Sequence, residues 1–306
     1  MGIVMTDALI HLAIALLMPP LLIGVINRVK AVMAGRRGAP LLQPYYELAR
    51  LWQKGTVFSR TTTWLFRAGP LVSLAATATA ALLVPFGGHG SPVAFGGDML
   101  LFAYLFALVR FATTTAALDT GSSFEGMGAA REVTFGCLAE PVLFFVLVAL
   151  ARESGSLSLT GILSHASSEM WPAEAASLIL MVVALFIVLL AENCRIPFDD
   201  PTTHLELTMI HEVMVLDHSG PAFALILYGA ALKLFVLGAL VLHLAIPFGT
   251  DAGILGWLTF TGSMLLLSVA IGIVESVMAR FRLLRVPQLL VAAASLAAFA
   301  LLLAVR

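Results

Sequence analysis

Eight stretches of predominantly apolar residues, separated by shorter polar segments, set the pattern of this chain. A helix of about 20 apolar residues crosses the hydrocarbon core of a bilayer, and each stretch is close to that length. The pattern predicts helices near residues 7–27, 69–86, 98–118, 134–151, 174–194, 221–246, 253–275 and 286–305. Pro19 and Pro20 predict a kink in the first of them. We therefore expect an all-α polytopic membrane protein, with residues 1–306 forming a single integral membrane domain, since no internal repeat or low-complexity linker divides the chain.

Two polar segments between the spans predict additional short helices. Between residues 43 and 54 the apolar positions recur with the period of a helix, which predicts an amphipathic helix in the first loop, lying on the lipid headgroups. Pro197 ends the fifth span because the residue before a proline avoids the helical conformation. A new helix then begins at Asp200 or at Thr203, whose spacing to Glu206 matches a capping box.

Composition agrees with this class of protein. The chain is 60% hydrophobic and 11% charged, whereas a soluble domain carries about 25% charged residues. A net charge of -1 argues against nucleic acid as a partner. The loops on one side, above all the first, hold thirteen of the 17 lysines and arginines, and the other side holds only Arg152 and Arg306. Because basic loops stay in the cytoplasm, we expect the first loop there and both termini on the outer face.

Charged residues also interrupt the apolar spans. Arg110, Glu140, Lys233 and Glu275 lie deep in the predicted helices, and Glu192 lies at the cytoplasmic end of the fifth. A charge at mid-helix costs about 2.5–3.5 kcal/mol on insertion scales, so these side chains face protein or water. One interpretation is internal salt bridging, for example of Glu140 or Glu275 with Lys233. For the whole set we favour a hydrated acid and base path through the bundle.

The densest polar segment is residues 191–220, where acids and histidines gather between two apolar spans. His211 and Glu212 resemble the start of a zinc motif, but Val215 stands where its second histidine belongs, so we expect no metal site. The two cysteines, Cys137 and Cys194, form no pair that could hold a cluster, and we interpret them as buried thiols.

Three motifs resemble the complex I subunit 1 family, whose members lie at the junction between the redox arm and the proton-pumping membrane arm. The most specific is Arg195-Ile-Pro-Phe-Asp199, followed by Glu206-Leu207. Arg37-Gly-Ala-Pro-Leu-Leu-Gln-Pro44 is similar to the family's first-loop motif, and Gly128-Ala-Ala-Arg131 with Glu140 is similar to its fourth-helix motif. The resemblance covers nearly the whole chain.

Departures from the family pattern point to one branch. Thr202 and His204 stand where quinone-reducing members carry glutamates, Gly55 replaces an acid, and the sequence Asp217-His-Ser-Gly220 replaces Glu-Tyr-Ser-Gly at a shifted position. This version is similar to the membrane anchors of group 4 [NiFe] hydrogenases such as formate hydrogenlyase and hydrogenase-4.

The resemblance implies a non-catalytic coupling subunit in a prokaryotic cytoplasmic membrane. The partners implied are the soluble hydrogenase large and small subunits, docked on the cytoplasmic side, and antiporter-like membrane subunits. No cofactor is expected in this chain; the [NiFe] centre and iron–sulfur clusters would belong to the partners. We expect proton or charge coupling at Glu140, Glu192, Asp199, Glu206, His211, Glu212 and Lys233. We expect docking and loop positioning by Arg37, Gln43, Glu47, Arg50, Lys54, Arg131, Arg195 and Asp217.

Two alternatives stay open at this point. One is a quinone-binding subunit 1 of a respiratory complex I, with a quinone tunnel between the first helix and the loops. The other is a stand-alone secondary transporter, which predicts inverted repeats and paired broken helices at mid-membrane, and the sequence has neither.

Overall fold

The computed structural model describes residues 2–166, 170–199, 209–248 and 253–304, and in these the ordered elements are helices. Eight helices are long and apolar enough to cross a membrane, which confirms the predicted class of a multi-pass membrane protein. The elements are α1 (Gly2–Met33), α2 (Gln43–Trp52), α3 (Trp64–Leu83), α4 (Asp98–Asp119), α5 (Ser123–Ser154), α6 (Leu159–His165), α7 (Trp171–Glu192), the 3₁₀ turn η2 (Glu212–Val215), α8 (Gly220–Ala245), α9 (Gly253–Val277), the 3₁₀ turn η3 (Leu283–Arg285) and α10 (Val286–Ala304).

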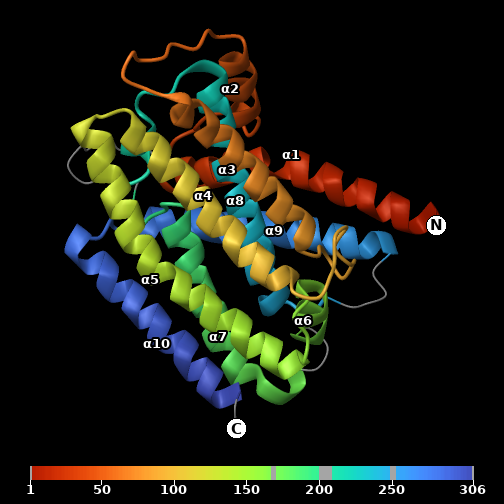
Figure 1. Cartoon of the computed structure of the whole chain (residues 1–306). Coiled ribbons are helices and arrows are strands. Elements are labelled where there is room, and N and C mark those ends of the chain that lie inside the picture. The colour runs from red at the N-terminus through yellow and green to blue at the C-terminus, as the bar shows by residue number, and fades with distance from the viewer. Residues whose placement is uncertain (1, 167–169, 200–208, 249–252, 305–306) are drawn as a thin grey trace.

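The long helices form three groups around α8. Helix α8 is buried along most of its second half and packs against α1, α3 and α7. Helices α5, α7 and α10 pack together on one side, and α3 packs along α4. Helices α1 and α9 lie side by side and cross the direction of α4 and α5 (Figure 1). The polar side chains described below lie where α4, α5, α7 and α8 meet and where α1 meets α9.

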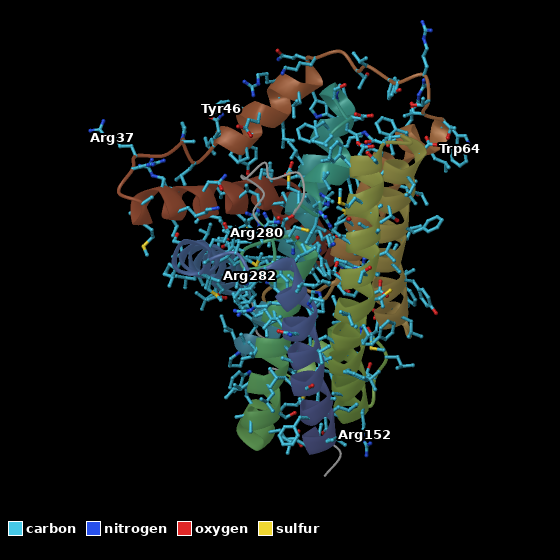
Figure 2. All side chains as sticks on the ribbon, turned by 90° about the vertical axis from the view of Figure 1, so that its left-hand side faces the viewer. Arg37, Tyr46, Trp64, Arg152, Arg280 and Arg282 are labelled. Atoms are coloured by element: carbon cyan, nitrogen blue, oxygen red, sulfur yellow. The ribbon has the colours of Figure 1, made fainter. Side chains whose placement is uncertain are left out.

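The labelled basic and aromatic side chains mark the two ends of the bundle. Figure 2 shows Arg152 at the opposite end from Arg37, Tyr46 and Trp64. The first loop, which carries Arg37 and Tyr46, and Arg152 therefore lie at opposite ends of the helix bundle. Which of the two sides faces the cytoplasm stays a prediction.

Helix α1 continues through Pro19 and Pro20. Proline has no N–H, so Pro20 leaves the carbonyl of Leu16 without its helical donor. The hydroxyl of Tyr228, on α8, donates to that carbonyl at 2.9 Å. A neighbouring helix thus satisfies the backbone group that the proline frees, which is how such residues are tolerated in membrane helices.

Helix α5 begins eleven residues before its predicted start, and the expectation that Arg131 lies in a loop is wrong. Hydropathy detects only the apolar part of a helix, whereas this helix has an amphipathic first third that packs on protein. Gly128 allows that packing, because a Cβ there would lie 2.4 Å from a side-chain carbon of Val213 in η2. The early start carries both Arg131 and Glu132 into the helix.

A helix, α2, occupies the first loop over Gln43–Trp52 and packs against α8 and α1. The hydroxyl of Tyr45 donates to the carbonyl of Leu17 in α1. The position of α2 on lipid headgroups stays a prediction. The helix predicted to begin at Asp200 or Thr203, and with it Glu206, lies outside the described residues.

Candidate functional site

Five charged side chains from four helices meet inside the bundle, and we call them the central charge cluster. The guanidinium of Arg110, on α4, donates to Glu140 on α5 and to Glu192 at the end of α7. Its Nε lies 3.7 Å from Oε1 of Glu132, also on α5. The ammonium of Lys233, on α8, lies 2.7 Å from Oε2 of Glu192. Glu192 is therefore shared by two cations.

The central charge cluster is unbalanced. It contains three carboxylates and two cations, so it carries one excess negative charge when every group is ionised. An uncompensated charge in a low-dielectric interior is costly. Arg110 keeps its charge at any physiological pH, so it is a permanent cationic partner for these carboxylates.

A second group of ion pairs lies where α1 meets α9. The ammonium of Lys30 lies 2.9 Å from Oε2 of Glu275, and Nη1 of Arg195 lies 3.3 Å from its Oε1. Glu275 is buried and receives both cations. Internal salt bridging, the interpretation that we did not favour, therefore holds for Arg110, Glu140, Lys233 and Glu275. The partners differ from the example given for it, because Glu275 and Glu140 pair with Lys30, Arg195 and Arg110 and not with Lys233.

Asp199 closes the segment that follows α7. Its Oδ1 lies 2.7 Å from Nη2 of Arg280, and its Oδ2 accepts the backbone N–H of Ile210 at 2.8 Å. Asp199 is 1% exposed. A buried carboxylate with a charged donor and a backbone donor is strongly held, so Asp199 fixes both ends of the chain between 199 and 210.

The largest of the cavities, the loop-side cavity of about 350 Å³, lies between α1, α2, α8 and the turn after α7. Its lining includes several of the predicted site residues, namely Gln43, Glu47, Arg195, Asp199, His211 and Glu212. The sequence prediction therefore selected side chains that the fold brings together, although they come from three separate stretches of chain.

Two smaller cavities follow, each of which shares lining residues with the one before it. The central cavity, of about 60 Å³, has Asn193 and His211 in common with it and reaches Glu132 and Lys233. The lateral cavity, of about 120 Å³, has Arg110 and Glu192 in common with the central cavity and is lined by Glu140. The three cavities form one series, which runs from the first loop to the central charge cluster.

The series ends at the side of the bundle. The side chain of Glu140 is 40% exposed, and Tyr104, which also lines the lateral cavity, is 71% exposed. Toward the far end of the bundle α8 continues instead with fully buried apolar residues, among them Leu240 and Leu244. A carboxylate at the surface of a membrane helix needs a polar partner, so the polar series opens sideways between α4 and α5.

The remaining predicted docking residues lie on or near the loop surface. Arg37, Arg50 and Lys54 are exposed, and Figure 2 shows Arg37 at the periphery of the molecule. Arg131 instead reaches inward and donates to the carbonyl of Met209 at 2.7 Å. Asp217 is exposed, and its backbone N–H donates to Glu125 at 3.1 Å.

The cysteines differ from each other. Cys194 is buried and lines the loop-side cavity, where burial raises its pKa well above the usual value and keeps the thiol protonated. Cys137 is exposed on α5, so the prediction of two buried thiols is wrong for it. Among the described residues no group of three or more His, Cys, Asp or Glu side chains is placed to hold a metal ion.

Sequence reasoning missed part of the central charge cluster. Arg110 stood out as a charge inside a span but received no coupling role, and Glu132 looked like a loop residue because α5 was predicted too short. Gly136 was missed altogether, although a Cβ there would lie 2.3 Å from Cζ of Arg110. Only the three-dimensional contact shows why a glycine stands midway between Glu132 and Glu140.

Comparison with known proteins gives a consistent picture. The family model for NADH dehydrogenase matches residues 6–306. Hydrogenase-4 component C of Escherichia coli strain K12 is 32% identical over 305 residues, which cover 98% of this chain and 95% of that protein. Formate hydrogenlyase subunit 4 of the same strain is also 32% identical, over 89% of this chain and 84% of its own length.

More distant similarities agree. One subunit of the NADH-quinone oxidoreductase of Rubrobacter xylanophilus is 28% identical over 73% of this chain and 68% of its own length. A chain of the membrane-bound sulfane sulfur reductase, an archaeal respiratory membrane complex, shares the fold with a TM-score of 0.85 at 20% sequence identity, covering 99% of this chain and all of that one.

Proposed function

Since the chain belongs to the NADH dehydrogenase family, in which complex I subunit 1 is found, we propose that it is the membrane-anchor and coupling subunit of an energy-converting [NiFe] hydrogenase complex of the formate hydrogenlyase and hydrogenase-4 kind. It docks a soluble hydrogenase module on the face that carries the basic first loop. It passes the redox event of that module, as movement of charge, to antiporter-like membrane subunits that translocate protons or sodium ions. That face is cytoplasmic in this proposal, and the membrane is the cytoplasmic membrane of a prokaryote.

The series of cavities supports the proposal most directly. It begins beside the loops, where a soluble partner can act on His211 and Glu212, and it ends at Glu140 on the lateral surface. A change of charge or conformation at the loop-side cavity would alter the central charge cluster, because charges within a few ångströms interact strongly at low dielectric. Asp199, Glu206 and His211 act at the interface in this scheme, and Glu140, Glu192 and Lys233 act deeper in.

Cofactors belong to the partners in this proposal. An iron–sulfur cluster takes four cysteine ligands in most proteins, and the chain has two cysteines in all. One of them is buried beside the loop-side cavity and the other is exposed on α5. The residues present do not fit a [NiFe] centre or a cluster, so the redox chemistry takes place outside this chain.

The test is replacement of Glu140 by Gln in the intact complex, with redox turnover and ion movement both measured in membrane vesicles. Glu140→Gln should leave the complex assembled but should lower the number of ions moved per turnover. Glu153→Gln, at the far end of the same helix, is the matched control and should leave coupling unchanged. Full coupling in Glu140→Gln would contradict the proposal, as would the absence of hydrogenase subunits from the complex purified through this chain.

A quinone-binding subunit of a respiratory complex I is the second candidate, and the loop-side cavity favours it. A space of about 350 Å³ between α1, α2 and α8 is within the size range of small-molecule sites. The candidate predicts stoichiometric quinone in the purified complex and inhibition by quinone-site blockers. Hydrogenase activity without bound quinone, and insensitive to those blockers, would exclude it.

A further inference from the structure

The Arg110 guanidinium separates two of the polar spaces. The central cavity has Glu132 and Lys233 in its lining, and the lateral cavity has Glu140. Arg110 and Glu192 line both, so their ion pair stands between the two cavities. Each cavity is large enough for several water molecules, which makes the ion pair the barrier between two hydrated spaces.

Gly136 provides the position in which the guanidinium rests. Glu132, Gly136 and Glu140 follow each other at intervals of four residues, so they lie on one face of α5. A Cβ on Gly136 would come within 2.3 Å of Cζ and Nε of Arg110 and within 2.7 Å of Nη1. The guanidinium therefore lies directly on the backbone of α5, with one carboxylate on each side of it along the helix.

The two flanking carboxylates are held unequally. The terminal nitrogens of Arg110 donate to Glu140 and Glu192, whereas Nε lies 3.7 Å from Glu132, beyond hydrogen-bond distance. A small displacement along α5 would exchange Glu140 for Glu132 as the closely paired acid.

We propose that the Arg110 guanidinium, resting on Gly136, is a movable partition that closes the central cavity from the lateral cavity. The proposal rests on the coupling function and deepens it. In the position that the structure describes, the partition is closed. Displacement of the guanidinium toward Glu132 opens the barrier and exchanges Glu140 for Glu132 as its closely paired acid.

Accessibility to silver ions tests the partition without any turnover of the enzyme. The vesicles contain the intact complex with Cys137→Ser and Cys194→Ser, and Ag⁺ is added on the side of the first loop. Thr113→Cys reports the central cavity and Ala103→Cys reports the lateral cavity, and both positions are on α4, on opposite sides of Arg110. With Arg110 and Gly136 intact, the thiol of Thr113→Cys should react with Ag⁺ at least about tenfold faster than the thiol of Ala103→Cys. A rate difference of this size reports a barrier between the two cavities.

Gly136→Ala is the decisive variant, because its methyl group occupies the place of the guanidinium. Ala103→Cys should then react about as fast as Thr113→Cys. Arg110→Lys is the second variant, in case the first does not assemble: it keeps the positive charge but cannot reach several carboxylates at once, and it should also raise the rate at Ala103→Cys. A static clamp between α4, α5 and α7 predicts lower thermal stability in both variants with no change in labelling. Equal labelling of the two reporters with Arg110 and Gly136 intact, or no rise in either variant, would overturn the proposal.

The outcome is independent of the coupling test. If Glu140→Gln stays fully coupled while the labelling contrast holds, then the coupling function fails and the partition stands. If Glu140→Gln uncouples while the contrast is absent, then the coupling function stands and the partition fails.

Discussion

The ammonium of Lys233 lies 2.7 Å from Oε2 of Glu192, while the other oxygen of the same carboxylate receives Arg110. Glu192 ends α7 and Lys233 lies in α8, so the contact ties two helices together where the central charge cluster meets the cavities. One carboxylate with two cationic partners has two alternative pairings available, and this makes Glu192 the central residue of the cluster.

Lys233→Met should destabilise the complex strongly. Removal of one partner from a buried ion pair leaves an uncompensated charge, which typically costs about 3–5 kcal/mol. We expect a lower midpoint of thermal unfolding in the purified complex and loss of coupled ion movement. Lys233→Arg preserves the charge and should recover most of the stability. An unfolding midpoint unchanged in Lys233→Met would show that Arg110 alone compensates Glu192.

Asp199→Asn should weaken the contacts of residue 199 with Ile210 and Arg280. The amide still accepts the N–H of Ile210 but no longer compensates Arg280, and a lost charged hydrogen bond is worth about 1.5–3 kcal/mol. We expect at least about fivefold faster proteolysis after residue 199, because the cleavage rate follows the population of molecules in which these contacts are broken. Arg280→Lys retains the charge and serves as the matched control. Equal cleavage rates in wild type and Asp199→Asn would contradict the assignment of Asp199 as the closing residue.

The segment that contains His218 should open as pH falls. His218 stacks on Phe66 with ring centroids 3.9 Å apart, and burial lowers its pKa to about 4 from the usual 6.5. Because the pKa of His218 is lower in the closed segment than in the opened one, the opened segment binds more protons once the pH falls below about 6.5. The stability of the closed segment is therefore complete above about pH 6.5 and is lost progressively as pH falls toward 4.

Amide hydrogen exchange at residues 216–219, followed from pH 7.5 to 4.5 and corrected for the intrinsic pH dependence of exchange, measures this opening. His218→Phe keeps a stacked ring without a titratable group and should remove the acid-induced rise in opening. The same rise in wild type and His218→Phe would assign the pH dependence to another group.

Tyr228→Phe should lower stability by about 1 kcal/mol, the usual net value of one hydrogen bond, because the carbonyl of Leu16 that Pro20 frees loses its donor. Thermal unfolding of the purified complex measures the change. Tyr46→Phe, at an exposed tyrosine of α2, should have no effect. Restoration of stability by combining Tyr228→Phe with Pro20→Ala would confirm that the proline creates the need for the hydroxyl. If the two substitutions instead change the stability additively, then the proline and the hydroxyl act independently.

The sequence predicted the helices well and the pairing of charges poorly, for a physical reason. Hydropathy over about 20 residues detects a membrane span because lipid contact requires apolar side chains, and all eight predicted spans have a counterpart among the described helices. The first third of α5 escaped because it packs on η2 rather than on lipid.

Ion pairs depend on which helices become neighbours, and hydropathy contains no such information. Glu275 therefore met Lys30 and Arg195 instead of Lys233, and Arg110 met three acids that are 22, 30 and 82 residues away. Gln43, Asp199 and His211, which come from separate stretches of the chain, all line the loop-side cavity.

The contact between Asp199 and Ile210 has a consequence for changes in chain length. Asp199 accepts the N–H of Ile210, so the chain returns at Ile210 to the point that it left. An insertion or deletion between these two positions leaves the register of Glu192, Arg195 and Asp199 unchanged, because all three precede it in the chain. An insertion between Glu192 and Asp199 would instead move the contacts of Glu192, Arg195 and Asp199 out of register with one another. Length differences among related proteins should therefore be found after Asp199 and not before it.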